Sequence, residues 1–311
     1  MGKVSIIGDR SGRIRPLALR AAARSRQEGR KLVLYVPEQY TLQAERDLIA
    51  GLDLPGLLEI QVVSPRKLTQ QVRERMGSGT KQPLGELGRA LALYRVMAEK
   101  EKEKALLYYE KMAGLPGAVS RIGDALDELR ESEITPEELS RFAEEAATSA
   151  ERAKIRDLET IRTAYEELIS EQFDDGKAVW TDTVQRLERS GLWDGADVIA
   201  YGFDTVRPDL RELVAGLCGK VNSFAVFLTM DREDAPDGRI FTAQRESAQR
   251  LARDLAAAGC RAEFVWPKGE RADCAEALSA LDRNLFAADA RPWPGDPGDA
   301  LALYAAGTPW E

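Results

Sequence analysis

The residues best placed to do chemistry lie in a short glycine- and arginine-rich segment near the N-terminus, Gly8-Asp9-Arg10-Ser11-Gly12-Arg13-Ile14-Arg15-Pro16. The segment follows a short apolar run, which is where a phosphate-binding loop would lie. In such a loop, backbone N–H groups wrap the phosphates, a Lys reaches the terminal phosphates and a Ser or Thr binds Mg²⁺. Here the glycine spacing is one residue short, and Arg13 or Ile14 replaces the Lys. Arg15 or Pro16 replaces the hydroxyl, and Asp9 adds negative charge.

A nucleotide site also needs an acid at the end of a later strand to hold Mg²⁺. The candidate strand ends Ile199-Ala200-Tyr201, so Tyr201 stands where the acid is expected, and Asp204 lies three residues further on. Both halves of the site are therefore degenerate. We expect a vestigial nucleotide site, no catalytic residue, no metal ligand and no bound ATP or Mg²⁺. The vestigial residues are Gly8, Ser11, Gly12, Arg13, Arg15 and, in the turn after the second strand, Gln39. An ordinary strand-to-helix turn is the alternative reading of the loop, and a helix cap that of Gln39.

Composition excludes several classes of enzyme. The 311 residues contain no His, which removes His-based acid–base chemistry, Ser-His-Asp and Cys-His nucleophiles and most catalytic zinc sites. The three cysteines, Cys218, Cys260 and Cys274, form no Cys-x-x-Cys pair, and we expect them to be buried or incidental thiols in a reducing compartment. No apolar stretch is long enough to span a membrane, and the N-terminal apolar run is too short for a signal peptide. The sequence therefore predicts a cytoplasmic protein.

The elements that must position these residues follow a strand–helix rhythm. Apolar runs predict strands at 4–7, 31–36, 58–64, 197–203, 223–229, 261–266 and 301–304, with helices between several of them. Pro16 is typical of a first helical turn, so the first helix is expected to begin there. The rhythm predicts an α/β fold with a parallel sheet.

A helical segment interrupts this rhythm. From about Leu84 to Arg189, apolar residues recur at helical spacing, as in Val119, Ile122, Leu126 and Leu129. The Thr135-Pro136 pair followed by Glu138 predicts a capped helix start. We therefore expect an α/β domain at 1–80 and 190–311, with an inserted lobe of three to five helices at 81–189.

Charge is unevenly distributed along the chain. The net charge is −8, which excludes a uniformly basic nucleic-acid binder. Residues 1–30 carry eight basic and two acidic side chains, whereas residues 121–174 carry seven basic and sixteen acidic ones. Open α/β sheets bind ligands at the carboxyl ends of their strands, so the basic loop after the first strand is the more informative cluster.

An ordered set of segments resembles the AddB/RexB family, the B subunits of bacterial ATP-dependent helicase–nucleases that process DNA double-strand ends. Lys31–Leu48 is similar to the family's "VPEQ-T-Q-E" segment, and Val62–Leu68 to its "SFSRL" stretch. The remaining matches are Gly85–Met97 to the "G–L–R" helix, Val198–Asp204 to the "VDGF" strand, Phe224–Thr229 to the next strand, and Ala302–Ala306 to the strand that opens the second motor-like half.

The resemblance implies a RecA-like first helicase domain with a helical insertion, inert as a motor. It implies a role in DNA-end processing and recombinational repair through contacts with DNA and with an AddA-type helicase–nuclease subunit. The family's nuclease domain lies further C-terminal, so this chain is expected to be a non-catalytic portion of an exonuclease/helicase subunit. The expected DNA contacts are Arg10, Arg13, Arg15, Ser64, Arg66 and Lys67.

Two other functions fit the residues. One is a divergent but active P-loop ATPase that holds phosphates with Arg13 or Arg15. The other is a protein-interaction module in which the acidic segment 121–174 binds a partner and nucleic acid is not contacted.

Overall fold

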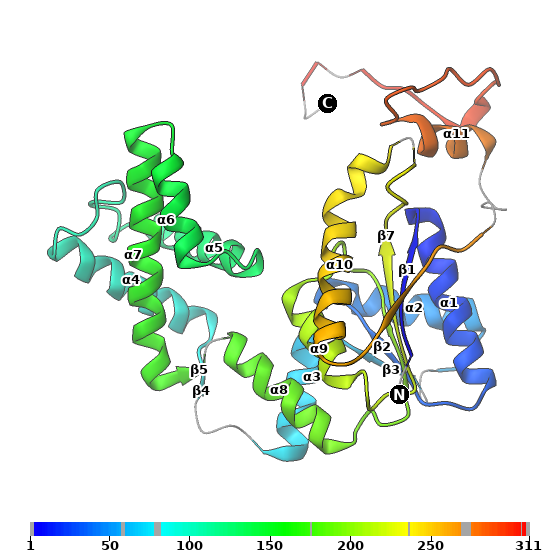
Figure 1. Cartoon of the computed structure of the whole chain (residues 1–311), viewed down its shortest axis with the longest axis horizontal. Coiled ribbons are helices and arrows are strands. Elements are labelled where there is room, and N and C mark those ends of the chain that lie inside the picture. The colour runs from blue at the N-terminus through cyan, green and yellow to red at the C-terminus, as the bar shows by residue number, and fades with distance from the viewer. Residues whose placement is uncertain are drawn as a thin grey trace. The chain divides into compact units, whose positions relative to one another are not determined.

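The computed structural model describes residues 3–56, 60–77, 82–174, 176–235, 237–268, 275–305 and 307–308 (Figure 1). The chain divides into two compact units. The sheet unit comprises Met1–Leu68, Gly191–Val206 and Leu213–Glu311, and the helical unit comprises Thr69–Ser190 and Arg207–Glu212.

A six-stranded parallel sheet forms the centre of the sheet unit, in the order β3-β2-β6-β7-β1-β8. The strands are β1 (Lys3–Asp9), β2 (Leu32–Tyr35), β3 (Ile60–Val63), β6 (Asp197–Ala200), β7 (Ser223–Thr229) and β8 (Ala262–Val265). The helices associated with it are α1 (Ser11–Gln27), α2 (Thr41–Leu52), α9 (Pro208–Leu217), α10 (Thr242–Ala257) and α11 (Glu276–Asn284), with short 3-10 turns η1 (Glu38–Tyr40), η2 (Gly238–Phe241) and η3 (Gly298–Ala300). The predicted α/β parallel sheet, consistent with a RecA-like fold, is confirmed.

Both faces of the sheet are covered, which explains why its central strands are largely apolar. All four residues of β2 are buried, and so are all four of β6. On one face, Leu34, Ile199 and Phe227 pack in one cluster with residues of α1 and α2. Figure 1 shows α10 on the opposite side of the sheet from α1. A parallel strand covered on both faces needs no polar alternation.

The helical unit has its own apolar core. Its helices are α3 (Pro65–Met76, which begins in the sheet unit), α4 (Glu86–Lys102), α5 (Pro116–Glu131), α6 (Pro136–Glu145), α7 (Ser149–Gln172) and α8 (Gly176–Ser190), with the short paired strands β4 (Gln82–Pro83) and β5 (Phe173–Asp174). The predicted stripe contributes Val119, Ile122 and Leu126 to a buried cluster that also contains residues of α4 and α7. The helix start at Thr135 is confirmed, because its side chain accepts a hydrogen bond from the Glu138 N–H and the Glu138 carboxylate accepts one from the Thr135 N–H.

Three local predictions were wrong. Helix α1 begins at Ser11, so Pro16 lies inside it, where its ring forfeits one backbone hydrogen bond without ending the helix. Residues 301–304 form no strand, and Leu303 and Tyr304 are exposed, because no strand among the described residues pairs with them. Cys218, which follows α9, and Cys260, which precedes β8, are joined in a disulfide instead of remaining thiols. Cys274 lies outside the described residues.

Candidate functional site

The carboxyl ends of the parallel strands bring the predicted site residues to one edge of the sheet. Because β7 lies between β1 and β6, these residues fall into two groups. Arg10 and Arg13 follow β1 and neighbour the ends of β7 and β8. Gln39, Ser64, Arg66, Lys67 and Tyr201 follow β2, β3 and β6. The first group contains the candidate nucleotide loop.

The connection between β1 and α1 is a single residue. Strand β1 ends at Asp9 and α1 begins at Ser11, so Arg10 alone joins them. A phosphate-binding loop needs several consecutive backbone N–H groups arranged around the anion, and this connection is too short to provide them. The space above Gly8 is also filled, since a Cβ there would lie 2.5 Å from the Trp266 ring. Gly12 lies within the first turn of α1, and the side chain of Ser11 lies outside the described part of the chain.

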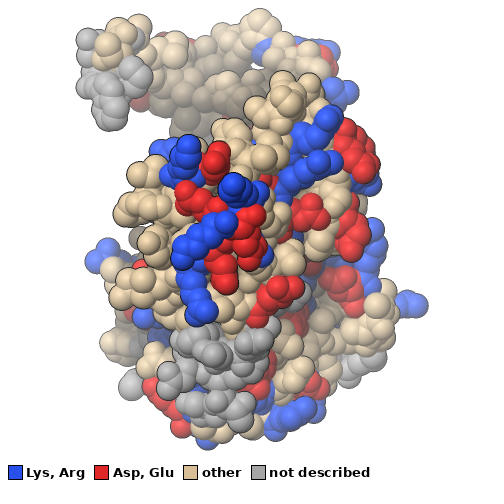
Figure 2. All heavy atoms as spheres, turned by 90° about the vertical axis from the view of Figure 1, so that its left-hand side faces the viewer, with Lys and Arg blue, Asp and Glu red and all other residues tan. Residues whose placement is uncertain are grey.

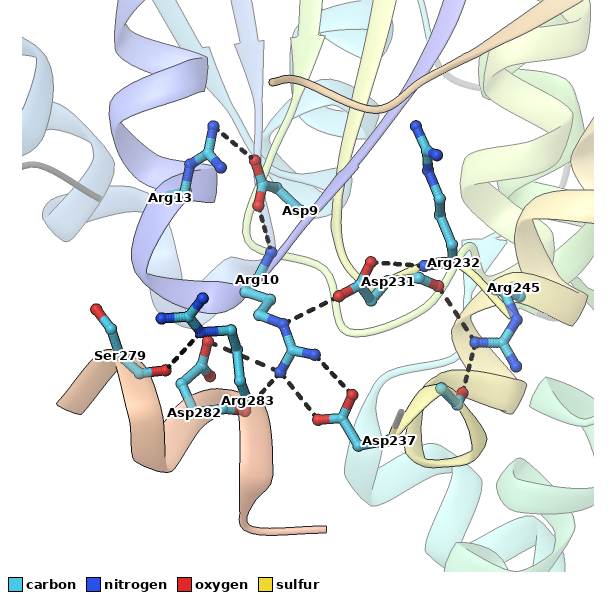
Figure 3. A network of polar contacts seen from close by, with 11 residues as sticks. Asp9, Arg10, Arg13, Asp231, Arg232, Asp237, Arg245, Ser279, Asp282 and Arg283 are labelled. Carbon is cyan, nitrogen blue, oxygen red and sulfur yellow. Dashed lines mark hydrogen bonds and ion pairs between the residues drawn. The ribbon is translucent and has the colours of Figure 1, made fainter. Parts of the chain in front are cut away.

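Arg10 is held by three carboxylates (Figure 3). Its Nη2 and Nη1 donate to the two carboxylate oxygens of Asp237 at 2.6 and 2.9 Å, and its Nε donates to Asp231 at 3.0 Å. On the α11 side, Nη1 donates to the backbone carbonyl oxygen of Asp282 at 2.5 Å and lies 3.7 Å from the Asp282 carboxylate. The Asp237 side chain is completely buried, and that of Arg10 is 15% exposed. We call these four residues the Arg10 cluster.

The guanidinium of Arg10 is already paired with carboxylates of this chain. The hydrogen bond to Asp237 raises the pKa of Arg10, against the effect of burial. Beside it, Asp9 accepts the Arg10 N–H at 2.8 Å and pairs with the Arg13 guanidinium at 3.3 Å. Burial raises the pKa of the Asp9 carboxyl. A phosphate entering here would meet carboxylates, and the two nearest arginines are already bound to them.

Tyr201, at the position where an acid would hold Mg²⁺, is part of a second polar group. Its hydroxyl lies 2.9 Å from the Tyr40 hydroxyl and donates to the buried Asp47 carboxylate at 3.3 Å. Arg15 pairs with the same carboxylate at 2.7 Å, so it faces α2 instead of the β1–α1 connection. Burial, followed by the hydrogen bond to Tyr40, raises the pKa of Tyr201 far above its usual range. A neutral phenol cannot supply the anionic ligand that Mg²⁺ prefers.

The residues following β2 and β3 are partly exposed to solvent. Ser64 is buried and accepts a hydrogen bond from the Lys67 N–H at 3.3 Å, so it helps to begin α3. Gln39, Arg66 and Lys67 are exposed. The Glu38 carboxylate accepts the Arg66 N–H at 2.6 Å, which joins the ends of these two strands.

Sequence reasoning missed the acidic partners of the arginines. Asp231 and Asp237 come from the segment after β7, and Asp282 from α11. A signal was available in Asp231-Arg232-Glu233-Asp234, an acidic run directly after a predicted strand that ends at the same edge as Arg10. Nothing in the sequence marked Asp282 or Asp47.

Two kinds of feature are absent from the described ranges. Within them, no helix is both long and apolar enough to cross a lipid bilayer. Nor do three or more His, Cys, Asp or Glu side chains in these ranges form a group that could hold a metal ion.

The comparison with known proteins agrees with this architecture. The family model described as "ADDB, N-terminal" matches residues 16–282. Proteins named as the B subunit of an ATP-dependent helicase/deoxyribonuclease are similar to this chain. The one from Alkaliphilus oremlandii is 29% identical over 71% of this chain and 20% of its own length. The one from Symbiobacterium thermophilum is 28% identical over 93% of this chain and 26% of its own length. The one from Thermoanaerobacter sp. is 31% identical over 64% of this chain and 17% of its own length.

The chain thus spans between 17% and 26% of the length of these three relatives. The family match begins after β1 and covers the other five strands of the sheet and the helical insertion described above. The chain belongs to the AddB N-terminal family.

Proposed function

We propose that this chain is a helicase-like domain that neither binds nor hydrolyses nucleotide and that serves DNA-end processing and recombinational repair as part of a helicase/deoxyribonuclease complex. It acts through contacts with DNA and with an AddA-type partner in the cytoplasm. The names of the relatives support the assembly, since each is called a subunit of a helicase/deoxyribonuclease. The observation that carries the loss of nucleotide chemistry is the Arg10 cluster, in which carboxylates surround the arginine at the β1–α1 connection.

Three independent features support this proposal. The β1–α1 connection consists of Arg10 alone, the space above Gly8 is filled by Trp266, and Tyr201 is a buried phenol bound to Asp47. Any one of these would weaken the binding of Mg·ATP, and together they leave neither phosphate nor metal a favourable position. The DNA contacts are assigned to the exposed edge after β2 and β3.

The first prediction concerns nucleotide binding. We expect the melting temperature to be unchanged by millimolar Mg·ATP, because the chain does not bind it. A ligand that did bind, at 100 times its Kd, would add about 2.7 kcal/mol to the free energy of unfolding and raise the melting temperature. Differential scanning calorimetry with and without Mg·ATP measures this. A clear upward shift that Arg13→Ala or Arg15→Ala removes would contradict the proposal and favour a divergent ATPase.

The second prediction concerns DNA. The double variant Arg66→Ala/Lys67→Ala is expected to bind a duplex end with a single-stranded tail more weakly, because two exposed cations at the sheet edge are lost. The slope of log K against log salt should fall by roughly 0.7–0.9 for each phosphate contact removed. Fluorescence anisotropy at several salt concentrations gives both quantities.

A charge-matched control separates this edge from general electrostatics. Arg20 on α1 and Arg253 on α10 are exposed. If Arg20→Ala/Arg253→Ala weakens DNA binding as much as the edge variant does, the assignment to Arg66 and Lys67 is wrong.

A further inference from the structure

Helix α4 in the helical unit presents an apolar row that its own core does not use. Leu87, Leu91 and Tyr94 are 74%, 58% and 49% exposed. They lie four and three residues apart, so they share one face of the helix. The core side of α4 is formed instead by Leu93, Val96 and Met97, which are buried. The exposed row is therefore a second apolar face on a helix that already has one.

This row borders a hollow of about 580 Å³ between α4 and the beginning of α5. Small residues line it, namely Ala90, Ala113, Gly114, Ser120 and Gly123, and Leu115, which precedes α5, is 56% exposed. Small side chains beside exposed leucines form a groove that accepts inserted side chains, which is how a groove between helices binds an amphipathic helix. We call the hollow and the adjoining row the α4 groove.

The charges around the α4 groove indicate the chemistry of the occupant. Glu86, Asp124 and Asp127 line it, together with Arg89 and Arg130. Arg89 is already paired with Asp127, so the lining meets an incoming partner with Glu86, Asp124 and Arg130, two carboxylates against one cation. Residues 121–174, which include most of the α5 wall, carry sixteen acidic and seven basic side chains. Figure 2 shows acidic and basic side chains interspersed on the face that it presents. The lining of the α4 groove itself carries three acidic and two basic side chains, and this net negative charge disfavours phosphates, so nucleic acid is a poor fit.

We infer that the α4 groove is a docking site for an amphipathic helix of the partner subunit, with an apolar face flanked by Lys or Arg. The inference rests on the proposed function, which requires such a partner. The leucines and Tyr94 supply the apolar contact, and Glu86 and Asp124 pair with the flanking cations. Interfaces of this kind depend on a few central apolar anchors. Leu91 occupies the middle of the row and is the central anchor.

The test measures the affinity of this 311-residue chain for the AddA-type subunit of the same organism, by isothermal titration calorimetry. Leu91→Glu places a charge in the apolar contact and should weaken binding at least tenfold. Since Leu91 is exposed, the variant should fold normally, which its melting temperature verifies. The matched control is Leu42→Glu on α2, where the leucine is 57% exposed in the sheet unit, and its affinity should be unchanged. Glu86→Lys/Asp124→Lys should weaken binding at least threefold at low salt.

Each other outcome is decisive. If the AddA-type partner binds the unaltered chain and Leu91→Glu equally well, the groove is not the docking site, although the proposed function stands. If the unaltered chain does not bind the AddA-type subunit at all, both the docking site and the proposed function are contradicted. Self-association that Leu91→Glu removes, seen by light scattering, would assign the groove to a second copy. If Leu91→Glu loses DNA binding, the α4 groove binds nucleic acid. If Leu91→Glu changes the melting temperature of the full-length protein but not that of this chain, the α4 groove is covered by another part of the same protein. Each of these three results overturns the inference.

Discussion

Replacing Arg10 with Met lowers the free energy of unfolding of the sheet unit by about 3–5 kcal/mol, the effect expected when one member of a buried ion pair is removed. The reason lies in what remains. The Asp237 carboxylate is completely buried and accepts two hydrogen bonds from Arg10, so without the guanidinium it is an uncompensated buried charge. Urea denaturation followed by tryptophan fluorescence measures the change.

Arg20→Met, on the helix that follows Arg10, is the matched control for that substitution. Arg20 is exposed, and the expected change is within about 0.5 kcal/mol. The loss of unfolding free energy in Arg10→Lys should lie between those of Arg10→Met and Arg20→Met. An ammonium restores the charge but cannot donate to Asp237, Asp231 and Asp282 in the same fixed geometry. An Arg10→Met protein as stable as the unaltered chain would show that Asp237 finds another partner and that the Arg10 cluster does not stabilise this edge.

We expect the second large effect in the helical unit, where Asp157→Ala should cost about 3 kcal/mol. The buried Asp157 carboxylate on α7 accepts the backbone N–H groups of Leu107, Tyr108 and Tyr109 at 2.8 to 3.1 Å. Hydrogen bonds to a charged group contribute roughly 1.5–3 kcal/mol, and buried N–H donors left without acceptors add a penalty. Hydrogen exchange at residues 107–109, together with chemical denaturation, measures the loss.

Asp157→Asn should lower the free energy of unfolding by less than Asp157→Ala does, because an amide keeps one acceptor oxygen but not the charge. Glu144→Ala on α6, an exposed acidic position, is the surface control. The account of this loop fails if Asp157→Ala and Glu144→Ala leave exchange at residues 107–109 equally slow.

The centre of the sheet was predictable from sequence because its central strands are buried on both faces. Leu32–Tyr35 and Ser223–Thr229 appear as apolar runs, and both form strands. Residues 301–304 have the same local character but form none, since a strand exists only where a neighbour pairs with it. The disulfide between Cys218 and Cys260 was unpredictable for a related reason, since 42 residues separate the cysteines and only the fold brings them together.

The candidate site was predictable in position but not in its contacts. The segment after β1 was correctly assigned to the carboxyl edge of the sheet, where parallel sheets place their sites. Arg13 pairs locally with Asp9, but the partners of Arg10 lie more than 200 positions away, such as Asp231 and Asp282, and the partner of Arg15 is Asp47 on α2. Pairing over such separations depends on tertiary geometry, which residue spacing does not encode.

The strand order also has a consequence for biosynthesis. Among the described residues, strand β1 pairs with β7 and β8, so it has no neighbour in the sheet until residues 223–229 have been made. The contacts between α6 and α7, by contrast, join elements that are close in sequence. Because contacts close in sequence form sooner than distant ones, we expect the inserted helices to fold while β1 is still unpaired. Strand β1 is then synthesised before the inserted helices but reaches its native contacts after them.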